Sequence, residues 1–412
     1  MLYLGLDVHR KQITVSVRDE QGNVQLRRQV STHPEKVKAF FEQLQALGES
    51  HYVALLEVCG FEDWLMRRLL ADPACQDVVR IRPEKRSKRK TDRRDAHQLS
   101  ELLWVNRVRL RTGERIQGVR RVYWPTEDEQ QDRQLTSLRC RLGQWRTRTL
   151  NQIHHLLRKH NREWEVPTKT FATIKTRQWL RGLQLNATDR LELDVLLNQW
   201  ELWDRQIQQT EERLAERFLR NPQAQLLTTI VGVSCYMALA ISSRIGDVTR
   251  FPRPRSLANF FGLTPGSRSS GETERLGSIT KEGSRMVRFL LGQLTLHVLR
   301  KDAKMRAWYK RIKLRRGAKI ARVAVMRRLA SILWHMLRHG EAYRYGGVPQ
   351  GTRRQEAPMS HGAPSVVSAA LAAAWSDHRG PVPEPSPGCD RRPRVRRRSG
   401  QGSTRPQSEA NS

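Results

Sequence analysis

The chain has 412 residues, and its 75 Lys and Arg against 41 Asp and Glu give a formal net charge of +34. So large an excess of one sign repels itself, so we expect a polyanionic partner, nucleic acid first and an anionic membrane surface as the weaker alternative. No run of about 18 apolar residues is present and the N-terminus lacks a signal-peptide pattern, which argues against a membrane-spanning or secreted protein.

Residues 1–125 predict a mixed α/β domain. Apolar runs at 2–7, 12–18 and 24–30, separated by polar turns, predict three consecutive strands. The next predicted elements alternate: a helix over 34–47, a strand over 52–58, a helix over 61–70, a strand over 77–83 and a helix over 91–108. Consecutive strands followed by alternating helices and strands favour a mixed sheet covered by helices.

Residues 126–225 change in character and carry almost no strand signal. Leu, Ile and Trp recur there at spacings of three and four, which predicts two long helices paired as an antiparallel hairpin or coiled coil, broken around Pro167. Trp145, Trp200 and Trp203 lie on this apolar stripe, so we expect them in a core rather than as stacking platforms for bases. We expect the hairpin to link the flanking domains or to mediate oligomerisation.

The rest of the chain divides into a helical unit and a tail. Residues 226–345 predict a small helical domain with a strong amphipathic helix over 315–337. Within it, 250–291 is dense in Gly, Ser and Pro but keeps hydrophobic residues, so we expect a structured loop between helices. Residues 346–412 hold 9 of the 18 prolines and predict a disordered, basic Pro/Ser/Arg-rich tail. The whole chain is therefore predicted to be α/β plus all-α.

Four acidic residues stand out in this strongly basic chain. Asp7 ends the first predicted strand and Glu57 a later one, while Asp92 and Asp95 lie three apart at the start of a helix. If the two strands are neighbours the carboxylates converge, and without a counter-charge they would repel one another. A pair of Mg²⁺ ions about 4 Å apart would remove this repulsion and clamp the attacking and leaving oxygens of a phosphodiester.

Each acid taken alone also has a purely structural interpretation. An Asp at a strand end is a common turn former, and an acid in a first helical turn is a common cap. The combination of strand Asp, strand Glu and helical D-x-x-D is more specific, because nucleases and recombinases with a ribonuclease-H-like core are laid out in this order. Nine Lys or Arg between Val79 and Arg94 adjoin the acids, either as a solvated face or as contacts that hold a phosphate backbone.

A second candidate site lies in the loop predicted over 250–291. Its "SSG" sequence places the hydroxyls of Ser269 and Ser270 beside a flexible glycine. The cations near it in sequence are Arg268, Arg275, Lys281 and Arg288. A serine hydroxyl among cations can attack phosphorus once its proton is removed. Ser-Gly is also ordinary turn chemistry, so this signal is weak by itself.

The cysteines and histidines predict no further site. The five cysteines include no C-x-x-C pair, which argues against a zinc ribbon or a disulfide framework and fits a reducing cytoplasm. They are Cys59, Cys75, Cys140, Cys235 and Cys389. We expect His9, His97 and His297 to be ordinary surface or core residues.

Four blocks of the sequence resemble a known family. "GLDVHRK", "LLEVCGF", "KTDRRDA" and "RFPRPRSLANFFGLTPGSRSSGETERLGSITKEGSRMVR" occur in the order found in transposases of the insertion-sequence-110 group, also called DEDD transposases or bridge-RNA-guided recombinases. The resemblance covers roughly residues 1–345, and the last block is long and specific. Residues 232–234 read "GVS" where the family commonly has "GVG", a difference that bears on contacts rather than on chemistry.

The resemblance implies a ribonuclease-H-like N-terminal domain similar to Holliday-junction resolvases and a C-terminal domain of the Transposase 20 type. It maps the family's DEDD tetrad, as Mg²⁺ ligands, onto Asp7, Glu57, Asp92 and Asp95. It maps the family's serine nucleophile onto Ser270, with Ser269 adjacent as the alternative. It also implies a homo-tetramer with sites shared between subunits, and a guide (bridge) RNA that pairs with donor and target DNA. A prokaryotic, nucleoid-associated location goes with these partners.

The resulting prediction is RNA-guided cleavage and exchange of DNA strands. With Mg²⁺ held by the tetrad, Ser270 would attack the scissile phosphate, form a phosphoserine link, and release it to the new hydroxyl end without ATP. Two alternatives stay open. One is a junction resolvase or nuclease that uses water and needs only the tetrad, and the other is a non-catalytic nucleic-acid-binding scaffold in which the acids are caps.

Overall fold

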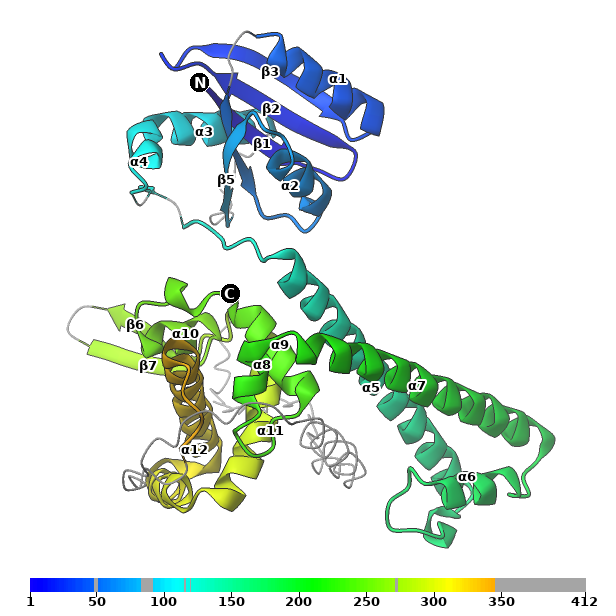
Figure 1. Ribbon diagram of the computed structural model, residues 1–412. Helices are drawn as coiled ribbons and strands as arrows, with labels where there is room; N and C mark the ends of the chain where they lie inside the picture. Colours follow the sequence, from blue (N-terminus) through cyan, green and yellow to red (C-terminus); the bar gives the residue numbers. More distant parts are fainter. Residues whose placement is uncertain (48–50, 83–91, 115, 119, 271–272, 345–412) are drawn as a thin grey trace, which may run out of the picture. The chain divides into compact units, whose positions relative to one another are not determined.

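The computed structural model describes residues 1–47, 51–82, 92–114, 116–118, 120–270 and 273–344, and at 92–94, 267–270 and 273–276 the description covers the backbone. The tail predicted over 346–412 therefore lies outside the described residues. The chain forms two compact units, unit 1 at Met1–Gln131 and unit 2 from Asp132 onward, and each is described by itself (Figure 1).

Unit 1 is built on a five-stranded mixed sheet. Its strands are β1 (Leu2–Val8), β2 (Gln12–Arg18), β3 (Val24–Ser31), β4 (Tyr52–Glu57) and β5 (Cys75–Ile81). Their order across the sheet is β3-β2-β1-β4-β5, where β1 pairs antiparallel with β2 and parallel with β4. The apolar residues of β1 are buried on both faces because this strand is central. The predicted mixed sheet is confirmed.

Helices cover both faces of this sheet. They are α1 (Pro34–Gln45), α2 (Asp63–Leu70), α3 (Asp92–Val105) and α4 (Arg107–Arg111). α1 and α2 pack against the face that carries Leu4 and Leu6. α3 packs against the opposite face, beside Tyr3 and Leu55. The alternation of side chains along β1 therefore sends Leu residues to one core and leaves the other face for α3.

The helix predicted over 91–108 is interrupted, and the buried Asn106 explains why. Its side-chain amide donates to the Leu102 carbonyl over 2.9 Å, and its side-chain oxygen accepts from the backbone amide of Gln117 over 2.8 Å. Asparagine competes for backbone groups in this way and so favours helix ends over helix interiors. The predicted helix thus becomes α3 followed by the short α4.

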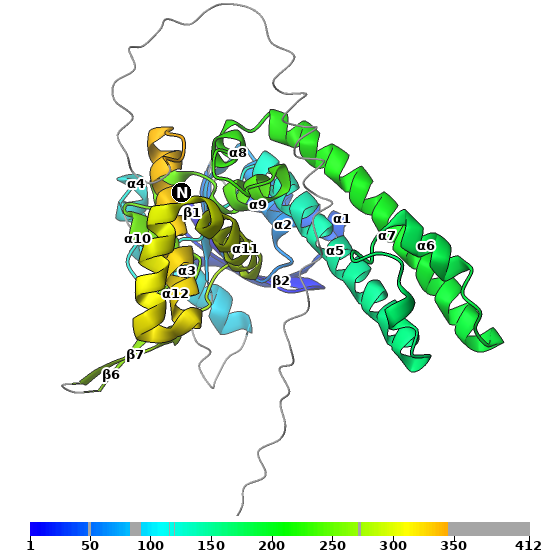
Figure 2. The ribbon, with the colours of Figure 1, turned by 90° about the horizontal axis from the view of Figure 1, so that it is seen from below.

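Two long helices dominate the first half of unit 2. They are α5 (Glu127–Lys159), which begins at the end of unit 1, and α7 (Ala187–Leu219). The short η1 (Glu163–Glu165) and α6 (Ile174–Arg181) lie between them, so the chain breaks around Pro167 as predicted. α5 and α7 run side by side in Figures 1 and 2, joined by ion pairs such as Arg139–Glu211 at 2.7 Å. The predicted helical hairpin is confirmed.

The tryptophans of this hairpin divide between core and surface. Trp200 is fully buried, as expected for the apolar stripe, whereas Trp145 is 43% exposed. The Trp145 and Trp203 rings lie 5.2 Å apart, and the Trp203 indole donates to the Thr149 hydroxyl. Both partly exposed rings therefore take part in packing between α5 and α7.

The second half of unit 2 is a helical body with one β-ribbon. Its elements are α8 (Pro222–Leu227), α9 (Cys235–Ile245), η2 (Val248–Arg250), α10 (Pro254–Phe260), β6 (Pro265–Ser270), β7 (Thr273–Ile279), α11 (Arg285–Lys301) and α12 (Ala303–His339). The helix predicted over 315–337 is part of α12, which has a bend at Gly317. One continuous apolar core, including Leu227, Leu257 and Leu291, joins the helices of this body. Among the described residues, none of the helices is long and apolar enough to cross a membrane.

Candidate active site

Asp7 and Glu57 occupy corresponding positions at the ends of neighbouring strands. β1 and β4 run parallel with Leu6 opposite Leu56, and the next residue along each strand is Asp7 and Glu57 respectively. Asp7 is 7% exposed and Glu57 is half-buried. The convergence predicted for these two carboxylates therefore rests on the register of a parallel strand pair.

The first turn of α3 lies at the same end of β1. A Cβ atom at Gly5 would lie 2.2 Å from the Ala96 carbonyl oxygen, so α3 crosses β1 directly at this glycine. Further along α3, Trp104 donates to the Glu20 carbonyl, beyond the end of β2 that pairs with the start of β1. α3 therefore runs back along β1, and its opening turn, with Asp92 and Asp95, lies toward the strand end that carries Asp7.

Two neighbours of Asp7 complete this end of the sheet. His9 Nε2 lies 3.1 Å from Asp7 Oδ2, and His9 is itself about half exposed. On the antiparallel side Asp7 pairs with Thr14, whose buried hydroxyl oxygen has no hydrogen-bond partner among the described residues. The sequence reading of His9 as an ordinary residue missed its contact with Asp7. The sequence pattern that could have indicated this contact is Asp7 and His9 two residues apart at the end of a predicted strand.

The donors at this end of the sheet suit a hard cation. They are carboxylate oxygens together with the unpartnered Thr14 hydroxyl, and Mg²⁺ prefers oxygen ligands. Among the described side chains, no three His, Cys, Asp or Glu groups come close enough to hold a metal ion. The Asp92 side chain lies outside that description, so the four-residue Mg²⁺ site remains a prediction.

The basic run beside the acids is only partly described. Residues 83–91 lie outside the described residues. Arg80, at its start, is buried, donates to Glu62 over 2.7 Å and stacks on the Trp124 ring at 4.6 Å. Burial raises the Glu62 pKa, but the hydrogen bonds from Arg80 and from the Glu62 and Gly60 backbone, with the Arg80 charge, together outweigh it, so the pKa lies below its ordinary value. Arg80 thus stabilises unit 1 and is not available as a phosphate contact.

The predicted nucleophile lies on a β-ribbon, and the expectation of a loop over 250–291 was wrong. β6 and β7 pair antiparallel, with Ser270 opposite Thr273 and Ser269 opposite Glu274, at the end of the ribbon that precedes residues 271–272. Figure 2 shows the ribbon projecting from the helices of unit 2. The sequences of β6 and β7, PGSRSS and TERLGSI, lack the alternation of apolar residues that predicts a strand, which is why the sequence did not reveal the ribbon.

The ribbon is fixed at its base by two glycines in close contact with the backbone. Gly262 has φ +67° and a Cβ there would lie 2.0 Å from the Glu282 carbonyl oxygen, while Gly283 has φ +86° and its Cβ would lie 2.0 Å from the Phe260 carbonyl oxygen. Only glycine combines these positive φ values with such an approach. The segment that leads into β6 and the segment that follows β7 are thereby held in contact.

Arg288 adds a polar clamp at the same base. Its guanidinium donates to the carbonyl oxygens of Phe261, Glu282 and Gly283 at 3.1, 3.2 and 3.1 Å. Burial, and then the nearby Arg285, lower the pKa of Arg288. Arg288 was predicted only as a cation near the serines, and its described contacts are with the base of the ribbon.

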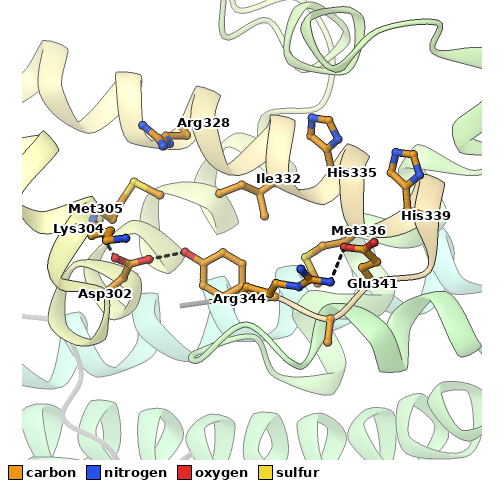
Figure 3. Close-up of a pocket in the computed structure, with 12 residues that line it drawn as sticks. Asp302, Lys304, Met305, Arg328, Ile332, His335, Met336, His339, Glu341 and Arg344 are labelled. Atoms are coloured by element: carbon orange, nitrogen blue, oxygen red, sulfur yellow. Dashed lines mark hydrogen bonds and ion pairs between the residues drawn. The ribbon is translucent and has the colours of Figure 1, made fainter. Parts of the chain in front are cut away.

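A cavity of about 590 Å³ lies elsewhere in unit 2, between the two ends of α12 (Figure 3). The Tyr343 hydroxyl donates to Asp302 over 2.7 Å and so brings the chain after α12 back to the start of that helix. Lys304 and Arg328 are among the residues of its wall. The residues described in its wall include none of the predicted tetrad or serine residues.

Comparison with known proteins decides the family. Residues 4–161, which include all four acids, match a DEDD-type IS110 transposase domain. Residues 224–310, which include both serines, match the transposase IS116/IS110/IS902 family. The chain belongs to the IS116/IS110/IS902 family of transposases. The first match covers the sheet of unit 1 and all of α5, and the second covers the helical body of unit 2 with its ribbon, up to the first turns of α12.

Relatives of this transposase extend over most of its length. It is 29% identical to the transposase for insertion sequence element IS1111A of Coxiella burnetii, over 83% of this chain and 91% of the relative. It is 26% identical to a probable family 20 transposase of Pseudomonas aeruginosa, over 83% of this chain and 98% of the relative. The protein is thus a transposase of an insertion sequence, an enzyme class that acts on DNA.

Proposed function

We propose that this transposase cleaves and exchanges DNA strands through a covalent phosphoserine intermediate formed by Ser270. The observation that carries the proposal is the position of the serines at the end of a projecting ribbon whose base is locked by Gly262, Gly283 and Arg288. Such an arrangement places the backbone of the serines within reach of a large, double-stranded substrate while fixing the strands that carry them. Because the chain belongs to a transposase family, we take DNA as the substrate.

The ladder register favours Ser270 over its neighbour. Position 270 pairs with Thr273, and two residues before it Arg268 pairs with Arg275. Position 269 pairs with Glu274. Because alternate positions of a ribbon share a face, position 270 falls in the set that includes two arginines, whereas position 269 falls in the set with an acid. A phosphate is attracted to the first set and repelled by the second.

We assign the metal-binding role to Asp7, Glu57, Asp92 and Asp95. Divalent cations held there would reduce the negative charge of the scissile phosphate and of the transition state. The register of β1 and β4 and the course of α3 support this assignment, because they bring three chain segments to one end of the sheet. His9, in contact with Asp7, would fix the orientation of that carboxylate.

The chemical step is an exchange of one phosphate ester for another. The Ser270 oxygen forms a bond to phosphorus, the bond from phosphorus to one DNA oxygen breaks, the serine proton passes to solvent, and the departing DNA oxygen takes up a proton. Attack by the hydroxyl end of the exchanged strand reverses the process and restores Ser270. No external energy source is required, because the number of phosphate ester bonds is unchanged.

We further propose, from the family resemblance, a guide RNA that selects the DNA sites and a homo-tetramer in which one site combines unit 1 of one subunit with unit 2 of another. The helical hairpin of α5 and α7 is the proposed oligomerisation element. An excess charge of +34 suits a complex with both RNA and DNA. Action on chromosomal DNA would place the protein at the nucleoid.

The test uses DNA that spans the ends of the element together with RNA transcribed from its noncoding flank. Wild type and Ser269→Ala are expected to give a DNA–protein adduct on a denaturing gel, and Ser270→Ala none. Strand cleavage without an adduct in Ser270→Ala would instead indicate hydrolysis by water. An adduct that persists in Ser270→Ala but disappears in Ser269→Ala would move the nucleophile to Ser269.

A further inference from the structure

α12 is the most strongly basic element of the described chain. Its 37 residues contain twelve Lys or Arg and no Asp or Glu. None of these twelve cations forms an ion pair with another described residue. In contrast, cations of the α5–α7 hairpin such as Arg139 and Arg146 are paired with carboxylates. No ion pair among the described residues therefore balances the charge of α12, although the hydrogen bonds from Thr249 and, to a smaller extent, the charge of Arg338 lower the pKa of Asp247.

The cations gather on an exposed part of the helix that we call the α12 elbow, residues 310–322. Seven of these thirteen residues are Lys or Arg, and all seven side chains are exposed. Two other cations of α12 have partners within the fold: Arg306 donates to the Leu299 carbonyl, and Arg328 stacks on the Trp308 ring at 4.9 Å. The elbow cations have no such hydrogen bond or ring contact among the described residues.

Gly317 gives the elbow its shape. Its backbone has φ 81° and ψ 164°, outside the helical region, so α12 bends there between two helical arms. A Cβ at Gly317 would meet nothing within 4 Å. The bend therefore depends on the backbone freedom of glycine and not on lack of space. Leu314 and Ile320, on either side of the bend, are 88% and 54% exposed.

We infer that the α12 elbow binds the phosphate backbone of duplex DNA. At about 1.5 Å per residue the two helical arms of the elbow together follow a path of about 20 Å, which the bend shortens from end to end, and the groove to be bridged is about 12 Å wide. The exposed Leu314 and Ile320 suit contact with sugars and thymine methyl groups within that groove. The elbow of a second copy is an unsuitable occupant, because it would set seven exposed cations against seven.

This inference deepens the proposed function by assigning DNA contact to a particular element, and it rests on that function only for the choice of DNA. It requires neither Ser270 as nucleophile nor a metal. Binding is therefore measured at equilibrium in EDTA, by fluorescence anisotropy of the full-length protein with a labelled duplex. If no DNA–protein adduct forms in the experiment above, the binding measurement can still support the elbow as a DNA contact. If the elbow does not bind DNA, the adduct experiment can still identify the nucleophile.

The first variant replaces Arg311, Arg315, Arg316 and Arg322 by Gln. We expect DNA affinity to fall at least about tenfold and the salt dependence of log K to flatten by up to about 3.6, at about 0.9 per lost phosphate contact. The matched control removes four exposed arginines of the α5–α7 hairpin: Arg141, Arg148, Arg205 and Arg220. An equal loss in both variants would show that only net charge matters and would overturn the inference.

The second variant, Gly317→Ala, changes no charge. Alanine is strained at this φ and favours continuation of the helix, so we expect at least about threefold weaker DNA binding with retained circular dichroism. Gly292→Ala, at a helical glycine of α11 with nothing within 4 Å, is the control and should bind normally. Unchanged binding in Gly317→Ala would overturn the role of the bend. If the four-arginine variant lost affinity for an RNA duplex but kept its affinity for DNA, the assignment to DNA would be overturned.

Discussion

Asp7 and Glu57 end two adjacent parallel strands in the middle of a five-stranded sheet, whereas Ser269 and Ser270 end one strand of a two-stranded ribbon. The acids are held by burial between two helical layers. The serines depend on the glycines and the arginine at the base of their ribbon. Ligands of a hard ion need a rigid setting, while a nucleophile for a large substrate needs access, and the two regions meet these needs differently.

Substitution of Asp7 should have the largest effect. Asp7→Asn keeps the shape of the side chain but removes its charge, so we expect strand cleavage to fall by at least about 100-fold while the melting temperature stays close to that of wild type. Asp63→Asn, an exposed acid of α2, is the control and should cleave normally. Normal cleavage by Asp7→Asn would show that this end of the sheet is structural.

Substitution at the base of the ribbon should come next. In Gly262→Ala the new methyl group meets the Glu282 carbonyl, so we expect the free energy of unfolding of unit 2 to fall by about 1–3 kcal/mol and adduct formation to be lost. Gly266→Ala, within β6, would place its methyl 3.7 Å from the Ser278 carbonyl and should retain both. Full adduct formation by Gly262→Ala would mean that the ribbon need not be fixed.

His9→Gln should have a smaller effect on the acidic region. Loss of the contact between the imidazole and Asp7 leaves that carboxylate less well oriented, and we expect about 10-fold slower cleavage. His33→Gln, at an exposed histidine before α1, provides the comparison. Equal rates in the two variants would remove His9 from the site.

The smallest expected effect concerns a buried acid that is fully paired. Asp189, at the far end of the helical hairpin, accepts from Lys159, Asn186 and His160, and these hydrogen bonds, with Lys159 the strongest, lower its pKa to about 2. A folded-state pKa below the ordinary value of 3.8 means that this stabilisation is complete above about pH 4 and is lost as pH falls toward 2.

We therefore expect Asp189→Asn to melt a few degrees below wild type at pH 7, with the difference vanishing between about pH 4 and pH 2. Thermal melts across that range measure it, and Asp194→Asn, which removes the exposed partner of Arg190, should show a smaller difference. A difference independent of pH would contradict the pairing. Strand cleavage should be unaffected at neutral pH, unlike in Asp7→Asn.

The sheet and its acids could be predicted because strands leave a local pattern. The apolar runs around Asp7 and Glu57 revealed two strands, although only the register of β1 and β4 shows that they are neighbours. Gly5 illustrates what stayed hidden: its need for a hydrogen in place of a side chain depends on Ala96 and Ser100, more than ninety residues later. No periodicity within one segment reports such a contact.

The serine ribbon and the ends of several helices could not be predicted for physical reasons. The sequences of β6 and β7 have no apolar alternation, and the close contacts at Gly262 and Gly283 join residues on either side of the ribbon. Asn106 ends α3 through a hydrogen bond to the backbone of Gln117, which local propensity does not contain. Tertiary contacts overrode local pattern at each of these places.

Joint action of the acids and the serine is tested by locating the DNA attachment in the protein by mass spectrometry. After reaction, nuclease treatment and trypsin digestion, residues 269–275 (SSGETER) form one peptide between Arg268 and Leu276. We expect a nucleotide on Ser270 in wild type and no modified peptide in Asp7→Asn. A modified peptide that is equally abundant in Asp7→Asn, or cleavage of DNA with this peptide unmodified, would contradict the joint action of the acids and the serine.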